Sequence, residues 1–357
     1  MPDNFQTDDL RIKGMRPLVP PAILLEEIPA KPEGQQLVAT TRSEISDALH
    51  GKDDRLVVVC GPCSIHHIEG ALDYASRLQK LRERFSDDLI LIMRTYFEKP
   101  RTVAGWKGLM NDPDLDETYK INKGLRIARQ LLSDLTDMKM PAACEFLDNI
   151  LPQYIADFVS WVAIGARTTE SQIHREFASG CSMPVGFKNN TSGRPDTAID
   201  AIRAAALSHW FPSVTKQGLS AILQTSGNDS CHIILRGGTE TGPNYDEASV
   251  LDVVSKLDEL GLPPRVMVDC SHGNSSKDYR KQKIAAESLA DQIAGGSKSV
   301  FGVMIESNIR EGRQDFIPGS ELEYGLSITD GCISIEETEQ MLELFASSVR
   351  SRSKVQA

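Results

Sequence analysis

The sequence predicts an α/β fold of the TIM-barrel type, a closed (β/α)8 barrel with an N-terminal extension and an inserted β-hairpin. Eight apolar runs of strand length recur along the chain, and helical patterns separate most of them. Strands that are apolar throughout are typical of parallel sheets with both faces covered, and eight such units favour a closed barrel over an open doubly wound sheet. Each run also ends in polar or charged residues, which is where such barrels carry their active sites.

The predicted strands are three to six residues long and largely apolar, too short for helices of ordinary length. In chain order they span residues 56–59, 89–93, 142–146, 161–164, 185–187, 232–235, 266–268 and 300–305.

Helical spacing of apolar residues fills most of the segments between these strands. A helix over 41–50 is expected beneath the first strand, and a closing amphipathic helix near the end of the chain. The predicted helices cover residues 41–50, 71–85, 121–135, 171–178, 197–206, 248–260, 283–293 and 336–351.

Two segments stand outside the barrel pattern. Residues 1–50 form a predicted arm, rich in proline up to about residue 45, with a short helix around 23–27 and the helix at its end. Residues 51–357 form the barrel, and alternating apolar residues within 211–224 predict a hairpin inserted into it.

Composition limits the classes of function. The chain has 357 residues, 40% hydrophobic and 25% charged, as in a globular protein with a large core. A net charge of −11 gives no positive electrostatic field that would attract nucleic acid. An anionic ligand would therefore need a local cluster of cations. We expect no secretory signal and no membrane span. Seven cysteines, an odd number without disulfide spacing, favour the reducing cytoplasm.

Cations follow four different predicted strands. Barrel geometry brings these strand ends to one mouth, and guanidinium groups bind phosphate and carboxylate in bidentate fashion. Although each cation alone would be read as a surface residue, together they predict a pocket for a multiply charged anion. The set comprises Arg94, Arg167, Lys188 and Arg236, with Lys99 and Arg101 close by.

A second set at the strand ends has the chemistry of a metal site. It comprises Cys63, His272, Glu306 and Asp330. A thiol, an imidazole and two carboxylates suit a first-row divalent ion better than magnesium or calcium. No short spacing identifies such a site, so two structural alternatives to metal ligation remain. His272 could be a buried structural histidine, and Asp330 could be the first residue of a helix.

Two other chemistries compete at these positions. Cys60-Gly61-Pro62-Cys63 has the spacing of a thioredoxin-like dithiol. Strand alternation, however, places Cys60 in or behind the barrel wall and Cys63 in the mouth. Lys188, which lies among arginines, could be the nucleophile of a Schiff-base aldolase, but this hypothesis leaves the Cys, His and carboxylate set unexplained.

At these residues the sequence resembles the type I 3-deoxy-D-arabino-heptulosonate 7-phosphate (DAHP) synthases. Ten ordered motifs carry the resemblance along nearly the whole chain, and most lie at strand ends. They include GPCSIH (61–66), MRTYFEKPRT (93–102), IGARTTESQIHRE (164–176), PVGFKN (184–189), ILRGG (234–238) and DCSHGNSSKD (269–278).

The resemblance implies condensation of phosphoenolpyruvate with erythrose 4-phosphate and release of phosphate. It implies a divalent metal (Mn, Fe, Co or Zn) on Cys63, His272, Glu306 and Asp330. It further implies a phosphoenolpyruvate site of Arg94, Glu145, Ala166, Arg167, Lys188 and Arg236, in which Glu145 positions water. Erythrose 4-phosphate would meet Lys99, Pro100, Arg101 and Thr102.

Three further expectations follow from the resemblance. Lys99 is our candidate to protonate the developing alkoxide. Cys63 is expected to be oxidation-prone without metal, with Cys332 as a possible disulfide partner. The nearest rival activity, that of 3-deoxy-octulosonate 8-phosphate synthases, is disfavoured by the Lys99–Thr102 segment and by the long arm.

The arm resembles that of the phenylalanine-inhibited members. This implies an effector pocket at Gln153, Ser182, Phe211 and Ser213, completed by Asp8, Asp9 and Ile12 of a neighbouring subunit in a homodimer or homotetramer. Ser213 favours phenylalanine, because tyrosine-inhibited relatives tend to have glycine there. Asn149 and Cys181 depart from the pattern, so tyrosine or tryptophan remain alternative effectors.

Overall fold

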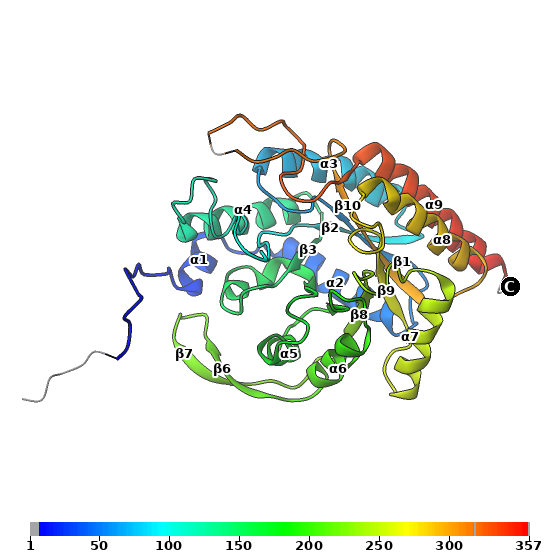
Figure 1. The fold of residues 1–357 in the computed structure, drawn as a ribbon, viewed down its shortest axis with the longest axis horizontal. Coiled ribbons are helices and arrows are strands. Elements are labelled where there is room, and N and C mark those ends of the chain that lie inside the picture. Colours follow the sequence, from blue (N-terminus) through cyan, green and yellow to red (C-terminus); the bar gives the residue numbers. More distant parts are fainter. Residues whose placement is uncertain (1–6, 318, 356–357) are drawn as a thin grey trace, which may run out of the picture.

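Eight parallel strands close into a barrel in the computed structural model, which describes residues 7–317 and 319–355 (Figure 1). Each strand pairs with its neighbour, and β1 also pairs with β10 to close the ring. All eight predicted strands are confirmed. They are β1 (Leu56–Gly61), β2 (Leu89–Arg94), β3 (Ala142–Glu145), β4 (Val159–Ile164), β5 (Val185–Lys188), β8 (Cys231–Leu235), β9 (Val266–Asp269) and β10 (Val300–Asn308).

Helices surround the barrel, as the apolar spacing predicted (Figure 1). Their bounds differ from the predicted ones by a few residues at most, apart from α2. They are α3 (Ile68–Arg84), α4 (Ile121–Asp137), α5 (Gln172–Ser179), α6 (Asp196–Ala205), α7 (Glu247–Glu259), α8 (Gln282–Ala294) and α9 (Ile335–Val355). Four short elements lie between or after them: η1 (Leu151–Tyr154), η2 (Ala156–Phe158), η3 (Tyr279–Lys281) and β11 (Ile333–Ser334).

The helix predicted over 41–50 is longer than expected. It is α2 (Pro32–Leu49), which begins nine residues earlier, because proline is well tolerated in the first turn of a helix. The predicted extended arm to about residue 45 is therefore wrong over this stretch. The buried end of α2 packs beneath the barrel, where Ile45 and Leu49 join the interior cluster that includes Val57 of β1.

Side chains alternate between two cores along each strand. In β1, Val57 and Val59 point into the barrel and Val58 points to the helices outside. The barrel interior is filled, with Trp161 and Phe301 packed on either side of His232. This packed floor confines any ligand to the mouth above it.

The predicted hairpin is confirmed as a separate two-stranded sheet of β6 (Trp210–Val214) and β7 (Ser220–Gln224). Its turn contacts the short helix α1 (Pro21–Glu27) through a hydrogen bond from Ala22 N to Lys216 O. Residues 7–17 before α1 are exposed and lead away from the body of the chain (Figure 1). The first six residues of the predicted arm lie outside the described residues. Among the described helices, none is long and apolar enough to cross a membrane.

Candidate active site at the mouth of the barrel

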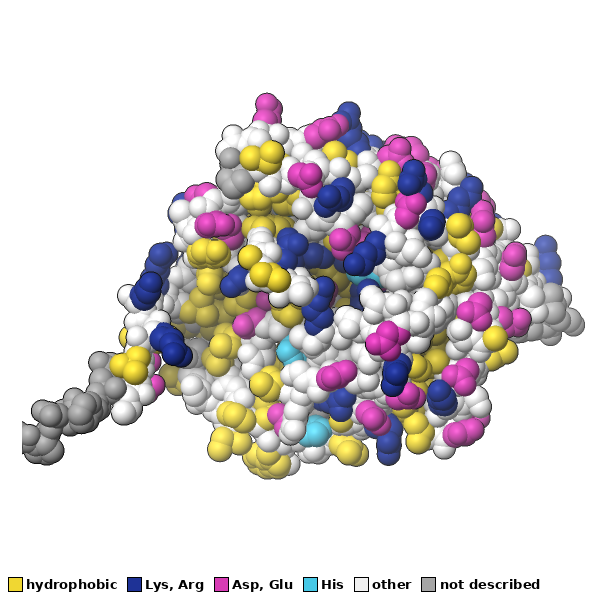
Figure 2. Space-filling view, viewed as in Figure 1, with side chains coloured by type: hydrophobic (Ala, Val, Ile, Leu, Met, Phe, Trp, Pro, Cys, Tyr) yellow, Lys and Arg dark blue, Asp and Glu magenta, His cyan; other side chains and the backbone are white. Residues whose placement is uncertain are grey.

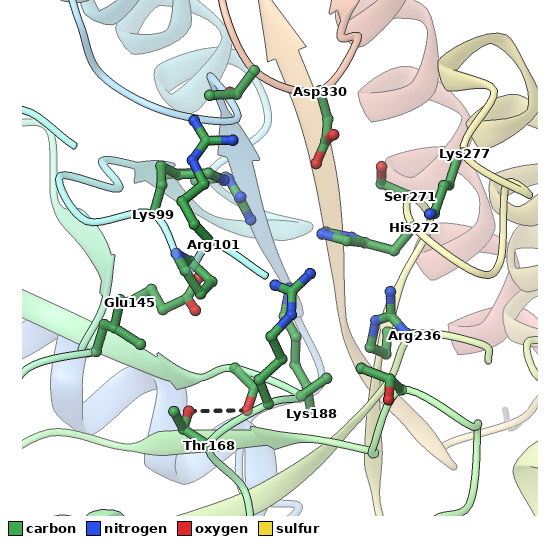
Figure 3. Close-up of a pocket in the computed structure, with 18 of the residues that line it drawn as sticks. Lys99, Arg101, Glu145, Thr168, Lys188, Arg236, Ser271, His272, Lys277 and Asp330 are labelled. Carbon is green, nitrogen blue, oxygen red and sulfur yellow. Dashed lines mark hydrogen bonds between the residues drawn. The ribbon is translucent and has the colours of Figure 1, made fainter. Parts of the chain in front are cut away.

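A cavity of about 360 Å³ opens at the carboxyl ends of the strands (Figure 3). Seen from outside, lysine and arginine side chains gather around this hollow in an otherwise mixed surface (Figure 2). Most of the predicted site residues line it: Arg94, Lys99, Pro100, Arg101, Glu145, Ala166, Arg167, Lys188, Arg236, His272 and Asp330. Cys63 and Glu306 are fully buried, and Thr102 Oγ1 lies 3.4 Å from Arg167 Nη2.

Lys188 forms a buried ion pair with Asp269. Its Nζ lies 2.9 Å from Asp269 Oδ2, and both side chains are buried. Although burial alone would raise the pKa of Asp269, His272 and Lys188 outweigh it and hold this pKa well below its usual range. A Schiff-base nucleophile must be a neutral amine, so this buried ion pair argues against the aldolase alternative for Lys188.

Arg94 joins the cation set to the metal set. Its Nη2 donates to Glu306 Oε1 at 2.9 Å and to Cys63 O at 3.2 Å, and its guanidinium lies 3.6 Å from the centre of the Tyr96 ring. Arg94 therefore fixes the backbone at Cys63 and one oxygen of Glu306 at the same time.

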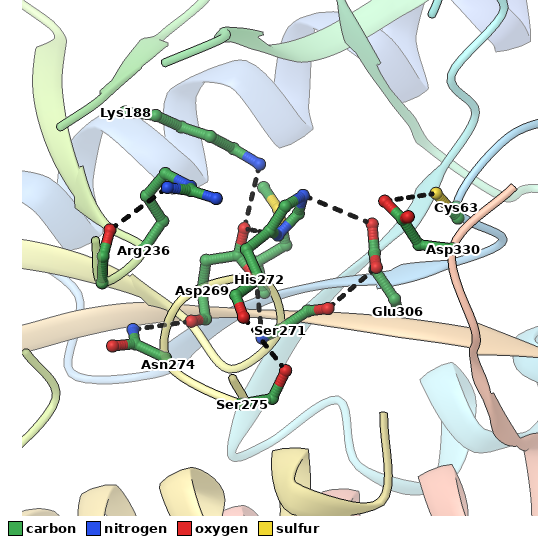
Figure 4. A network of polar contacts seen from close by, with 12 residues as sticks. Cys63, Lys188, Arg236, Asp269, Ser271, His272, Asn274, Ser275, Glu306 and Asp330 are labelled. Carbon is green, nitrogen blue, oxygen red and sulfur yellow. Dashed lines mark hydrogen bonds and ion pairs between the residues drawn. The ribbon is translucent and has the colours of Figure 1, made fainter. Parts of the chain in front are cut away.

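Three of the four predicted metal ligands come together. The ligand atoms of Cys63, Glu306 and Asp330 all lie within 4.8 Å of one another, and Cys63 Sγ lies 3.8 Å from Asp330 Oδ2 (Figure 4). Burial and Glu306 raise the pKa of the Cys63 thiol, an effect that a bound cation reverses. Two carboxylates and a thiol so close together suit a divalent cation between them.

His272, the fourth predicted ligand, is turned toward this cluster. Its Nε2 lies 3.8 Å from Glu306 Oε1, while its Nδ1 lies 2.9 Å from Asp269 Oδ2. The residue adopts a left-handed φ of 58°, which is uncommon outside glycine and is found at functional sites. A carboxylate behind Nδ1 is the arrangement that orients a ligating histidine.

Lys99 contacts the metal set directly. Its Nζ lies 3.1 Å from Cys63 Sγ and 3.2 Å from Cys63 O. Burial lowers the pKa of the Lys99 amine, but Cys63 and Glu306 outweigh it, so the pKa is raised. Lys99 is therefore protonated in the cavity.

The two cysteines at the end of β1 lie in different environments. Cys60 belongs to the outer core, where burial raises its pKa to about 12 despite a hydrogen bond with Tyr74. Cys63 lies with Glu306 and Asp330 under the cavity. Both are free thiols, as is the buried Cys332, so the dithiol alternative has no support in this geometry.

Gly165 shows why a small residue follows β4. A Cβ there would lie 2.4 Å from Glu145 Oε1, so a larger residue would displace that carboxylate from its place in the cavity wall.

Several residues of the cavity wall were missed from the sequence. Lys277, Tyr279 and Arg313 line the cavity but lie beyond the ends of β9 and β10, Lys277 and Arg313 on loops and Tyr279 at the start of η3. The only available signal was the proximity of Lys277 to His272 in sequence.

A second cavity, of about 340 Å³, holds part of the predicted effector set. Gln153 and Ser182 line it, together with Phe146, Phe177, Cys181 and Lys216. Phe211 and Ser213 lie on β6, and the described lining residues do not include them. Asp8, Asp9 and Ile12 are exposed on the arm. The Lys216 ammonium, which donates to Gln153 O at 2.5 Å, ties this cavity to the hairpin.

Both the sequence and the fold of the chain match known proteins. Residues 28–343 match the model of the DAHP synthetase I family. The chain is 56% identical over 347 residues to phospho-2-dehydro-3-deoxyheptonate aldolase of Haemophilus influenzae, covering 97% of this chain and 96% of the relative. It is also 56% identical over 349 residues to the Phe-sensitive enzyme of that name from Escherichia coli, covering 98% and 99%.

Relatives with another effector and a solved structure match as well. A tyrosine-inhibited enzyme of Schizosaccharomyces pombe is 52% identical over 354 residues, covering 98% of this chain and 95% of the relative. The solved structure of phospho-2-dehydro-3-deoxyheptonate aldolase from Francisella tularensis superposes with a TM-score of 0.93 at 50% identity, covering 96% and 99%.

Proposed function

The chain belongs to the DAHP synthetase I family and is a DAHP synthase, and from this premise we propose that the cavity at the barrel mouth binds phosphoenolpyruvate and erythrose 4-phosphate. The observation that carries the proposal is the meeting, in one cavity, of the cations from four strands with the Cys63–Glu306–Asp330 cluster. The octulosonate alternative is not favoured, because the family model and the relatives at 56% identity are DAHP synthases.

The cations bind and orient the two phosphate esters. Arg167, Lys188 and Arg236 surround phosphoenolpyruvate, and Arg101 and Thr102 hold the phosphate of the aldose on the other side of the cavity. Fixing both substrates converts a bimolecular reaction into an effectively unimolecular one. A bond forms between C3 of phosphoenolpyruvate and the aldehyde carbon. Water, positioned by Glu145, adds at C2, and phosphate leaves by C–O cleavage.

Lys99 is the proton donor in this proposal. Its ammonium is buried beside Cys63, and its raised pKa keeps it protonated until an alkoxide develops nearby. A general acid must reach the atom that it protonates, and Lys99 directly precedes Pro100 and Arg101 in the cavity wall while its Nζ contacts Cys63 Sγ.

The donor set fits a first-row divalent metal ion, and Cys63, His272, Glu306 and Asp330 would hold it. When bound, such an ion supplies a Lewis acid for the aldehyde oxygen. The fit rests on the clustered ligand atoms and on His272, whose Nε2 lies 3.8 Å from Glu306 Oε1 while Asp269 Oδ2 lies 2.9 Å from its Nδ1. Arg94 and Ser271 hold one oxygen each of Glu306 at 2.9 and 2.8 Å.

The choice of aldose tests the proposed function. Purified protein is expected to form heptulosonate phosphate and inorganic phosphate from phosphoenolpyruvate and erythrose 4-phosphate. With arabinose 5-phosphate we expect no octulosonate product above background. Equal or faster turnover of arabinose 5-phosphate would contradict the proposal.

We further propose that the second cavity binds an aromatic amino acid, with phenylalanine preferred over tyrosine and tryptophan. Phe146 and Phe177 offer an aromatic wall, with ring centres 5.8 Å apart, while Gln153, Ser182 and Lys216 offer polar partners for the amino acid group. The exposed arm would contribute Asp8, Asp9 and Ile12 to a neighbouring subunit of a homodimer or homotetramer.

Calorimetry with each aromatic amino acid tests the effector. Phenylalanine is expected to bind more tightly than tyrosine or tryptophan, and to lower the rate of product formation. Ser213→Gly is the matched variant, expected to shift the preference toward tyrosine because tyrosine-inhibited relatives tend to have glycine at this position of β6. The idea fails if phenylalanine does not bind at millimolar concentration.

A further inference from the structure

Three buried asparagines lie beneath the cavity, each in a loop that follows a different strand. Asn189 follows β5, Asn244 lies in the loop after β8, and Asn274 lies in the loop after β9. Their exposed fractions are 0%, 9% and 4%. Lys188 is the last residue of β5, directly before Asn189, and the loops after β8 and β9 carry Arg236 and His272.

The asparagines bind the backbone that carries Arg236. Asn189 Oδ1 accepts from Arg236 N at 2.8 Å, and Asn244 Oδ1 accepts from Gly237 N at 2.7 Å. Asn189 Nδ2 donates to Gly237 O at 3.1 Å, and Asn274 N donates to Arg236 O at 3.2 Å. All four backbone polar groups of Arg236 and Gly237 are therefore bonded to these asparagines, at the point where β8 has ended and ladder hydrogen bonds cease.

The same side chains are bonded to one another. Asn244 Nδ2 donates to Asn189 Oδ1 at 3.2 Å, and Asn244 N donates to Asn274 Oδ1 at 2.8 Å. Asn274 Nδ2 donates to Asp269 O at 2.8 Å, close to the Asp269 carboxylate that pairs with Lys188 (Figure 4). In each side chain the oxygen only accepts and the nitrogen only donates. A carboxamide satisfies this pattern, whereas a carboxylate lacks the donor.

Close backbone packing makes this support necessary. Gly237 adopts a left-handed φ of 68°, and a Cβ there would lie 2.5 Å from Gly273 C. The loops after β8 and β9 therefore touch through their backbones, and no side chain can fill the space to fix Arg236. Fully satisfied buried polar networks make a conformation rigid and unique.

We propose that Asn189, Asn244 and Asn274 form a positioning triad that fixes Arg236 for phosphoenolpyruvate. The proposal rests on the proposed function, which assigns Arg236 to that substrate. Residues that orient metal ligands change affinity or activity by about 10- to 100-fold when they are lost, and we take the lower end of this range for residues that orient Arg236. Loss of Asn244 should therefore weaken the binding of phosphoenolpyruvate more than it affects the other substrate.

Asn244→Ala tests the proposal, with Asn228→Ala as the matched control. Asn228 is also a buried asparagine of the β5–β8 region, but it lies before β8 at the opposite end of the barrel. It donates to Ala178 O and Met183 O and accepts from Ser230 N. Both substitutions remove a buried carboxamide, so both should lower the thermal unfolding midpoint, and only Asn244 should affect Arg236.

Phosphoenolpyruvate binding is measured by calorimetry, and KM for each substrate by steady-state kinetics. For Asn244→Ala we expect Kd and KM for phosphoenolpyruvate to rise about tenfold, with KM for erythrose 4-phosphate and kcat within about threefold of wild type. Asn228→Ala should keep the wild-type Kd. Asn244→Asp keeps the acceptor for Gly237 N and loses the donor to Asn189. It should therefore raise Kd and KM for phosphoenolpyruvate less than Asn244→Ala does. If the alanine variant does not fold, Asn244→Asp provides the test.

The proposal is overturned if the Asn244 variants bind phosphoenolpyruvate like wild type, or if Asn228→Ala weakens binding equally. Failure of the proposed function gives a different result, since wild-type protein would then neither bind phosphoenolpyruvate nor turn it over.

Discussion

Cys63→Ala is expected to abolish tight binding of a divalent metal ion and to reduce product formation by more than about a thousandfold, because a Lewis acid supplies several kcal/mol of charge stabilisation in the transition state. Cys63 offers the only thiol in the cluster with Glu306 and Asp330 in the described part of the chain. Without it, two carboxylates and one imidazole remain, a set that binds soft first-row ions less tightly.

Cys60→Ala is the matched control for this prediction. It removes a thiol three residues away, at the end of the same strand, from the outer core rather than from the cavity. Metal content measured by mass spectrometry and product formation should both stay close to wild type in Cys60→Ala. A Cys63→Ala protein that retained one tightly bound metal per chain and full activity would show that the cluster is not the metal site.

Lys99→Ala is expected to lower kcat by about 10²- to 10⁴-fold, the usual contribution of a positioned acid or base. The reason is the loss of the only ammonium that contacts Cys63 Sγ in the described structure. Metal content should remain, since Lys99 is a neighbour of the ligands and not one of them.

Lys107→Ala serves as the control for Lys99. Lys107 lies on the same loop with its side chain exposed, and its backbone oxygen accepts from Lys99 N at 3.0 Å, so the loop is kept while a surface charge is lost. Steady-state kinetics separates the outcomes. If Lys99→Ala kept near-normal kcat and raised only KM, Lys99 would be a binding residue and not the proton donor.

The barrel was predictable because its strands are apolar on both faces, and this pattern differs sharply from the helices between them. The start of α2 was not predictable, because residues 29–36 carry two prolines and several polar residues, a composition typical of an extended arm. Pro32 instead occupies the first turn of the helix, where its missing N–H is not needed.

The site was predictable in its chemistry and not in its geometry. Cys63, Glu306 and Asp330 could be grouped because each follows a predicted strand or loop at the mouth, and the structure brings them together. Asn244 could not be recognised, since asparagine after a glycine-proline pair is ordinary turn chemistry. Its importance arises only from three loops that meet in space. Lys277 and Arg313 were missed for the same reason.

We expect the strand ends of this barrel to form a metal-dependent active site. Heptulosonate formation by metal-stripped protein, with Mn, Fe, Co and Zn restored in turn, tests it most directly. We expect no product from the stripped protein, and recovery of product formation with at least one of these ions. Full activity in the stripped protein, or no product with any of the four metals, would contradict it.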